Sequence, residues 1–141
     1  MEPIADIPRV NVLISTNNGG QYIGEQIESI LRQTYSNIHI YIRDDGSTDN
    51  TRDVLDTFRC PDITVIEGEQ IGYGKSFLTL LEMSDEGKYW AYCDQDDVWL
   101  PEKISTAVKW LEKQEESVPC MFHSAYYNTD EDLNPIDITK E

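Results

Sequence analysis

Three of the four residues at positions 94–97 are aspartates: Asp94, Asp96 and Asp97. They lie in the stretch CDQDDVW at residues 93–99, directly after the apolar run YWAY. Carboxylates this close repel one another unless a cation lies among them or one of them stays protonated. Asp94 and Asp96 stand at alternate positions, so both carboxylates can aim at one point, as a divalent cation with oxygen ligands requires. The stretch therefore predicts a site for Mn²⁺ or Mg²⁺, with diphosphate oxygens completing the ligands.

The same aspartates also allow a purely structural interpretation. Acidic side chains favour the positive end of a helix macrodipole, and a helix is expected to begin near Pro101. Asp97 alone would serve that purpose. The polar clusters that follow other strands favour the metal site.

A second polar cluster, DDGSTDNT, follows the apolar run IHIYI and an arginine. We expect Ser47, Thr48 and Asp49 to accept backbone N–H groups at the start of the next helix. Asp44 and Asp45 are more informative, because a turn needs only one of them. The pair is a candidate for binding a ligand.

The elements that must position these clusters can be read from short apolar runs alternating with amphipathic segments. Strands are expected at residues 10–15, 38–42, 63–67, 88–93 and 120–127, and helices at 22–33, 51–58, 75–83 and 101–113. This alternation predicts an α/β fold, a mostly parallel sheet flanked by helices. Ligands bind at the carboxyl ends of such strands, so the two acidic clusters and residues 15–18 should converge at one edge.

The composition restricts the domain organisation, the partners and the compartment that we expect. The 141 residues, 39% hydrophobic, fit a single domain over 1–141, with a loosely ordered polar tail at 128–141. The 27 acidic and 11 basic residues give a formal charge of −16, which argues against a nucleic-acid partner. Three cysteines without CxxC spacing favour a reduced compartment. With no signal peptide or membrane-spanning run, we expect a cytoplasmic protein, associated with the inner face of the membrane only peripherally or through absent regions.

Four segments together resemble a known family. The chain carries, in order, VLISTNNGGQYIGEQIESILRQTY, IRDDGSTDNT, GYGKSFLTLL and YCDQDDVWLPEKI. This succession resembles the N-terminal, nucleotide-binding half of family 2 glycosyltransferases, which have the Rossmann-like GT-A fold, and it covers about residues 9–135. DQDDVWLPEKI and KSF are most similar to bacterial enzymes that transfer rhamnose or related sugars during surface polysaccharide synthesis. The resemblance implies a truncated GT-A domain.

The resemblance also implies roles for residues at the nucleotide. Ser15 and Asn17 stand where family members contact the base, and Asp45 matches the carboxylate that hydrogen-bonds the pyrimidine ring. Gly72 and Lys75 lie where a third loop passes the nucleotide, although an ordinary solvated lysine is an equal interpretation of Lys75. Asn17 replaces a frequent tyrosine, which removes a stacking surface.

The family's DxD motif matches Asp94 and Asp96. The resemblance implies that Asp94 faces the ribose or the metal and that Asp96 binds the metal, with Asp97 as a further acid beside them. Ala125 stands where many relatives carry an acceptor-side aspartate. His123 lies nearby, but a lone histidine on a strand is more often packed than catalytic.

The implied reaction is inverting transfer from a nucleoside diphosphate sugar, either dTDP-rhamnose or a UDP-hexose, to a glycan or lipid-linked acceptor. The catalytic base is expected beyond Glu141, so the isolated chain should be inactive in transfer. The alternative is a non-catalytic fragment that binds a nucleotide or a partner. A nucleotidyltransferase ranks last, because TNNGG has no basic residue for phosphate. The oligomeric state stays open.

Overall fold

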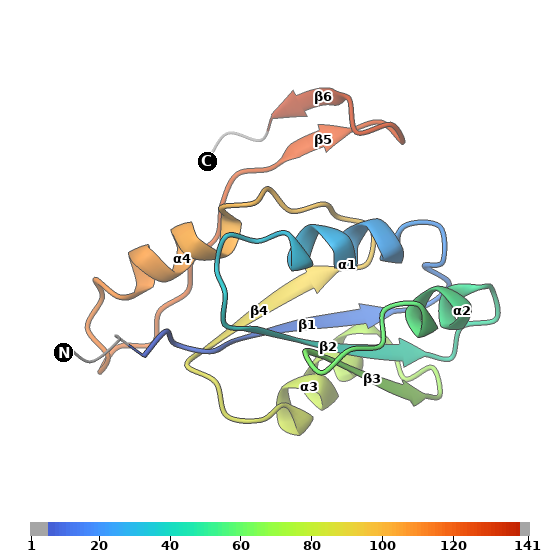
Figure 1. Ribbon diagram of the computed structural model, residues 1–141, viewed down its shortest axis with the longest axis horizontal. Helices are drawn as coiled ribbons and strands as arrows, with labels where there is room; N and C mark the ends of the chain where they lie inside the picture. The colour runs from blue at the N-terminus through green and yellow to red at the C-terminus, as the bar shows by residue number, and fades with distance from the viewer. Residues whose placement is uncertain (1–5, 139–141) are drawn as a thin grey trace. The chain divides into compact units, whose positions relative to one another are not determined.

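The computed structural model describes residues 6–138 and contains alternating strands and helices (Figure 1). The elements are β1 (Val10–Thr16), α1 (Ile23–Leu31), β2 (Ile38–Asp45), α2 (Thr51–Asp56), β3 (Ile63–Gly68), α3 (Tyr73–Met83), β4 (Tyr89–Asp94), α4 (Lys103–Leu111), β5 (Tyr127–Thr129) and β6 (Pro135–Ile138). The chain divides into two compact units, residues 1–105 and 106–141. Among the described residues, no helix has the length and apolar character needed to cross a bilayer.

The first unit is built on a four-stranded sheet with the order β3-β2-β1-β4. All its strand pairs are parallel. The register places Ser15 of β1 opposite Arg43 of β2 on one side and opposite Asp94 of β4 on the other. The prediction of a mainly parallel α/β sheet is therefore confirmed, and the carboxyl ends of three strands meet at one edge as expected.

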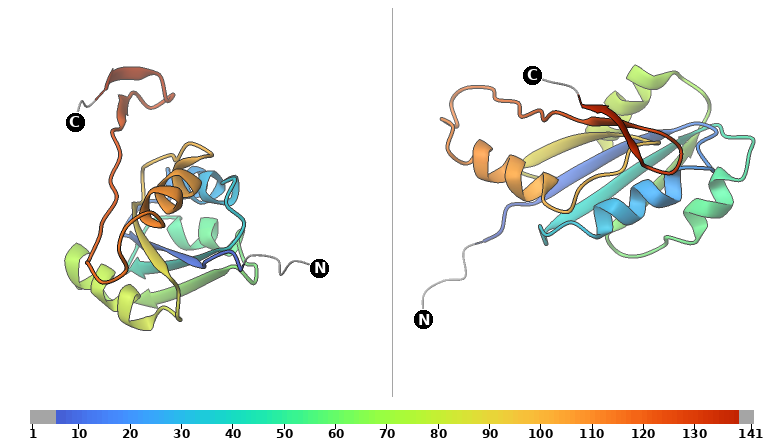
Figure 2. Two further views of the ribbon diagram at one scale, coloured as in Figure 1. Left: turned by 90° about the vertical axis from the view of Figure 1, so that its left-hand side faces the viewer. Right: turned by 90° about the horizontal axis from the view of Figure 1, so that it is seen from above.

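Helices cover both faces of this sheet, with α1 and α2 on one face and α3 on the other (Figures 1 and 2). Under α3, a buried cluster joins Leu13, Tyr41, Phe77 and Leu80. The other face buries β-branched residues of β1 and β2 together with the apolar stripe of α1: Val12, Ile14, Ile40, Ile42, Ile23, Ile27 and Ile30. Each such side chain stabilises the fold by about 1.5–3 kcal/mol, and the β-branched residues suit a pleated, buried strand.

The end of β2 and the start of α3 differ from the predicted boundaries, and both differences affect residues of the site. β2 continues through Asp44 and Asp45, which pair with Glu67 and Gly68 of β3, so both aspartates are strand residues and the turn begins after them. α3 begins at Tyr73, two positions before the predicted start at residue 75.

The second unit contains a short hairpin in which β5 and β6 pair antiparallel. The predicted strand over residues 120–127 is wrong for residues 120–126, which are irregular. These residues have the aromatic and apolar character of a strand, but β-propensity forms a strand only where a partner supplies hydrogen bonds and burial. Met121 is 79% exposed, so it lacks that burial.

The hairpin turn is organised by Asp130. Its carboxylate accepts hydrogen bonds from the backbone N–H groups of Asp132 at 3.0 Å and Asn134 at 2.9 Å, and from the Asn134 side chain. These bonds lower the pKa of Asp130. The predicted loose order of residues 128–141 stays a prediction, and residues 139–141 lie outside the described range.

Candidate functional site

An open cavity of about 290 Å³ lies at the carboxyl edge of the sheet. Its lining residues are Ser15, Asn17, Asp45, Gln70, Gly72, Tyr73, Asp94, Gln95 and Asp96. Every residue predicted to contact nucleotide or metal is among them except Lys75, which is an exposed residue of α3. The structure thus brings the predicted residues together, while their roles in binding stay predictions.

The acidic turn after β4 forms one wall of the cavity. Asp94, Asp96 and Asp97 are all exposed, and the Asp97 N–H donates to the Asp94 carbonyl at 3.5 Å. The pKa of Asp97 is raised, first by the loss of water around the carboxyl and then by the charges of Asp94 and Asp96, which Lys103 partly offsets. Crowding of like charge is therefore present here, as the sequence predicts.

Tyr73 lies beside this acidic turn. Its hydroxyl donates to Asp94 Oδ1 at 3.0 Å. Partial burial, this hydrogen bond and the charges of Asp94 and Asp97 raise the pKa of Tyr73. The ring meets Phe77 edge-on at 4.8 Å between centroids, and Phe77 meets Tyr92 in the same way at 5.3 Å. The tyrosine thus packs against Phe77 of α3 and contacts a predicted metal ligand, Asp94.

The donor set fits a divalent metal that arrives with its substrate. Within residues 6–138, no group of three or more His, Cys, Asp or Glu side chains forms a complete metal site. Asp94 and Asp96 nevertheless supply two exposed carboxylates to one cavity. Mg²⁺ is commonly held by one or two carboxylates plus substrate phosphates and water. Two carboxylates are therefore sufficient if diphosphate oxygens complete the ligands.

On the opposite wall, Asp45 is buried and its carboxylate is already engaged. It forms an ion pair with Arg43 and accepts hydrogen bonds from the backbone N–H groups of Ile71 and Gly72, each at 3.2 Å. The Asn17 side chain donates to the Asp45 carbonyl at 2.8 Å. Asp45 therefore fixes the loop before α3 as well as lining the cavity.

The sequence analysis did not predict the role of Arg43 as the partner of Asp45. Its side chain is 8% exposed and also donates to the Glu69 carbonyl at 3.2 Å. A Cβ at residue 68 would lie 2.8 Å from the Arg43 Cζ, so the glycine there makes room for the guanidinium. The available signal was an arginine placed between an apolar strand and two aspartates, because a buried cation requires an anionic partner.

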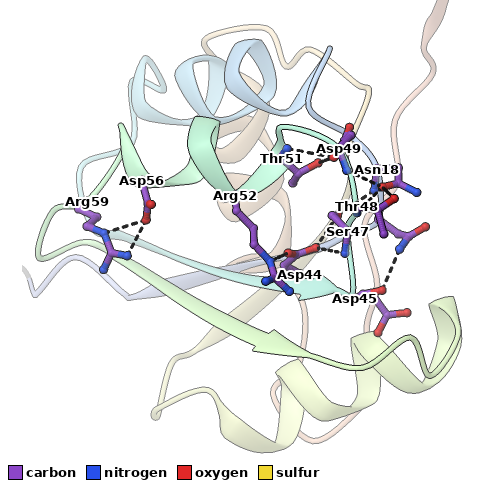
Figure 3. Close-up of polar contacts among 11 residues, drawn as sticks. Asn18, Asp44, Asp45, Ser47, Thr48, Asp49, Thr51, Arg52, Asp56 and Arg59 are labelled. Atoms are coloured by element: carbon purple, nitrogen blue, oxygen red, sulfur yellow. Dashed lines mark hydrogen bonds and ion pairs between the residues drawn. The ribbon is translucent and has the colours of Figure 1, made fainter.

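Asp44 has a structural role instead (Figure 3). Its fully buried carboxylate accepts the Ser47 N–H at 3.1 Å and forms an ion pair with Arg52 Nε at 3.0 Å. Asn18, with φ of 49°, joins the loops after β1 and β2, since its Oδ1 accepts the Thr48 N–H at 2.8 Å. These contacts shape the loops around the cavity, and Asn18 carried no recognisable signal in the sequence.

The capping prediction is right for only one of its three residues. Asp49 accepts the Thr51 N–H at 3.0 Å in the first turn of α2, and also the Gly20 N–H at 3.1 Å. These bonds, led by those from Thr51, lower the pKa of Asp49. For Ser47 and Thr48 the prediction is wrong, because both contact Asn18 instead.

Ser15 contacts α3. Its hydroxyl donates to Ser76 Oγ at 2.7 Å, and Ser76 is fully buried. This bond ties the end of β1 to the helix that carries Tyr73. The predicted contact of Ser15 with a base stays a prediction.

A parallel sheet with a cavity at its carboxyl edge and a pair of exposed carboxylates in its wall agrees with the GT-A fold of glycosyltransferases. The solved structures agree. Staphylococcus aureus TarS 1–349 in complex with UDP-GlcNAc is similar with a TM-score of 0.69 and 25% identity, over 74% of this chain and 31% of that one. The mannosyltransferase PcManGT from Pyrobaculum calidifontis, in complex with GDP-Man and Mn²⁺, is similar with a TM-score of 0.66 and 30% identity, over 76% and 33%.

The chain belongs to Glycosyl transferase family 2, whose profile matches residues 11–138. This confirms the resemblance found in the sequence. GlyG of Streptococcus pneumoniae is 32% identical over 86% of this chain and 40% of its own length. The dTDP-rhamnosyl transferase RfbG of Shigella flexneri is 36% identical over 70% and 36%, and the Escherichia coli glucosyltransferase WfaP is 32% identical over 74% and 42%. The chain thus spans less than half the length of these relatives.

Proposed function

We propose that this chain is the donor-binding portion of an inverting glycosyltransferase that takes a nucleoside diphosphate sugar together with Mn²⁺ or Mg²⁺. One observation carries the proposal: a single cavity collects Asp45 from the end of β2, Asn17 from the loop after β1, and Asp94 and Asp96 from the end of β4 and the turn after it, with β1 between β2 and β4. A nucleotide has a base at one end and a diphosphate at the other. The two walls suit these two ends.

The residues of the two walls would bind different parts of the donor. Asp45 is fixed by Arg43 and two backbone N–H groups, and its carboxylate would accept a hydrogen bond from a pyrimidine N–H. Asp94 and Asp96 would hold the metal, with Asp94 also close to the ribose. When bound, the metal would neutralise the negative charge that develops on the leaving diphosphate. Lys75 is exposed outside the cavity lining, and we assign it the weaker role of attracting phosphate.

The named relatives suggest the donor and the acceptor. RfbG is named as a dTDP-rhamnosyl transferase, and WfaP as a UDP-Glc:alpha-D-GlcNAc-diphosphoundecaprenol beta-1,3-glucosyltransferase. We propose dTDP-rhamnose or a UDP-hexose as donor and a glycan or lipid-linked glycan as acceptor. A lipid-linked acceptor would place the reaction in the cytoplasm at the inner face of the membrane.

Calorimetry tests the proposal. UDP and dTDP should bind in the presence of Mn²⁺ and bind much more weakly in EDTA, because the carboxylates of Asp94 and Asp96 repel an unaccompanied diphosphate. Asp96→Asn should abolish the metal-dependent part of binding without lowering thermal stability, since it removes charge from a crowded turn. Asp56→Asn is the matched control, because Asp56 pairs with Arg59 on the surface, outside the cavity lining. Equal affinity for UDP with Mn²⁺ and in EDTA would refute the metal's role.

The alternative is a fragment that binds a nucleotide or a partner without turnover. The chain spans only about a third of TarS 1–349, which favours an incomplete acceptor site. Much of a transfer rate comes from orienting donor, acceptor and base together, worth about 7–11 kcal/mol. We therefore expect the 141 residues alone to give no glycosidic product, only slow hydrolysis of the donor, by mass spectrometry. An acceptor-dependent product would show that the base lies within the chain, with His123 and the acids at 130–132 as candidates.

A further inference from the structure

Gln95 lies between Asp94 and Asp96 in the acidic turn, residues 94–97. It connects that turn to the end of β1. Its Oε1 accepts hydrogen bonds from the Thr16 hydroxyl at 2.7 Å and from the Asn17 backbone N–H at 2.9 Å. A backbone N–H can only donate, so the Asn17 bond fixes the amide with its oxygen toward β1. Gln95 therefore joins a predicted base-contacting residue to the turn that carries the predicted metal ligands.

Gly19 makes room for this amide. A Cβ at residue 19 would lie 2.8 Å from Gln95 Cδ and 2.7 Å from Thr16 Oγ1, and it would overlap Gln95 Oε1. Approaches below 3.0 Å force neighbouring atoms to move. The close approach of the chain after β1 to the Gln95 side chain therefore depends on glycine at this position.

The acidic neighbours of Gln95 are held much less firmly. Asp94 and Asp96 are exposed, whereas Gln95 is partly buried. The Asp94 carboxylate contacts the hydroxyl of Tyr73, whose side chain is itself 65% exposed. Two exposed carboxylates share a cation more tightly when the backbone between them is fixed, because less conformational freedom is then lost on binding.

We propose that Gln95 is a positioning residue: its amide ties the acidic turn to β1, so that Asp94 and Asp96 face the same ligand as Asn17. This inference rests on the proposed function of the cavity. Gln95 need not touch the ligand, because it acts through the two aspartates, while the Thr16 hydroxyl and the Asn17 backbone N–H anchor its amide. The Gly19–Gln95 contact makes the arrangement sensitive to a single added methyl group.

Gln95→Ala tests the inference. Affinity for UDP in the presence of Mn²⁺ should fall about tenfold, as expected for the loss of one or two hydrogen bonds at the site. Affinity for UDP in EDTA should change little, because positioning of the aspartates affects only the metal-dependent part. A merely structural role would instead lower both affinities alike. Gln114→Ala is the matched control, since the Gln114 side chain donates to the nearby Trp110 carbonyl at 3.0 Å and is not among the residues that line the cavity.

A second pair of variants tests the close contact between Gly19 and the Gln95 side chain. Gly19→Ala should displace the Gln95 amide and reproduce the loss seen in Gln95→Ala, whereas Gly74→Ala, where a Cβ meets nothing within 4 Å, should bind normally. In the double variant Gly19→Ala/Gln95→Ala the glycine substitution should cost much less, because the Gln95 atoms that it overlaps are gone and the remaining close atom, Thr16 Oγ1, is at the end of a side chain that can rotate. Full additivity of the two losses would contradict the proposed contact.

Amide hydrogen exchange gives a readout that needs no ligand. The Asn17 N–H should exchange slowly in the wild type and faster in Gln95→Ala, while Gln95→Glu should retain slow exchange because its carboxylate can accept the same bond. If the wild type fails to bind Mn²⁺ with UDP, the proposed function and this inference both fall. If the wild type binds and Gln95→Ala binds equally well, the inference alone falls.

Discussion

Two adjacent aspartates at the end of β2 have different tasks. The Asp44 carboxylate bonds Ser47 and Arg52 and shapes the turn after the strand. Asp45 lines the cavity and is held by Arg43. Successive residues of a strand point to opposite faces, so the neighbouring carboxylates of Asp44 and Asp45 meet different surroundings. Residue type alone could not separate a structural aspartate from a candidate binding residue.

The buried pair Arg43–Asp45 predicts a large effect on stability. Both side chains are nearly fully buried, with exposures of 8% and 5%. Arg43→Met would leave the Asp45 carboxylate buried without its cation, which costs about 3–5 kcal/mol in comparable pairs. Denaturant unfolding should show that loss.

The control for this prediction is the exposed pair Arg32–Glu28, whose side chains are 73% and 50% exposed. Arg32→Met should change the free energy of unfolding by less than about 1 kcal/mol. Replacing both buried partners, as in Arg43→Met/Asp45→Leu, should recover much of the loss, since an apolar pair needs no counter-charge. Equal effects of Arg43→Met and Arg32→Met would show that the buried pair does not support the fold.

At the scale of elements, α1 shows what periodicity can and cannot predict. Its apolar stripe was recognisable because the spacing of isoleucines is a local property. The polar contacts were not: Ser29 Oγ of α1 accepts the Trp99 N–H at 3.0 Å, and Gln33 Oε1, two residues beyond α1, accepts the Ile104 N–H at 3.0 Å. The fully buried Gln26 contacts Cys93, whose thiol pKa burial raises. These polar residues hold the segment after β4 against α1.

The strand predictions were likewise right where local pattern decides the structure and wrong where pairing with a distant segment decides it. Buried strands such as β1 were predicted within a residue, because β-branched runs and turn residues mark them locally. Residues 120–126 had a similar composition yet form no strand. The end of β2 was misplaced because its last residues are polar, and their pairing with β3 and, for Asp44, with Thr16 of β1 keeps them in the sheet. Where pairing with a distant segment decides the structure, local pattern is insufficient.

At the scale of the whole molecule, the parallel order β3-β2-β1-β4 explains why motifs far apart in sequence predict one site. The carboxyl ends of β1, β2 and β4 lie together, so the polar residues after them share a cavity. Arg43, Asn18 and Gln95 were not predicted, because each acts through a contact that exists only after folding. The sequence thus indicated six of the nine residues that line the cavity, but neither the other three, Gln70, Tyr73 and Gln95, nor the supporting residues Arg43 and Asn18.

The most direct test of the central claim locates the metal on the protein. Amide NMR signals should be recorded with UDP and Mg²⁺ and again after replacing a small fraction of the Mg²⁺ with paramagnetic Mn²⁺. The signals of residues 94–97 and 15–17 should broaden first, because the cavity brings these two segments to one ion. Asp96→Asn should remove the selective broadening. Broadening centred elsewhere, for example on the acidic residues 130–132, or no selective broadening, would contradict the proposed donor site.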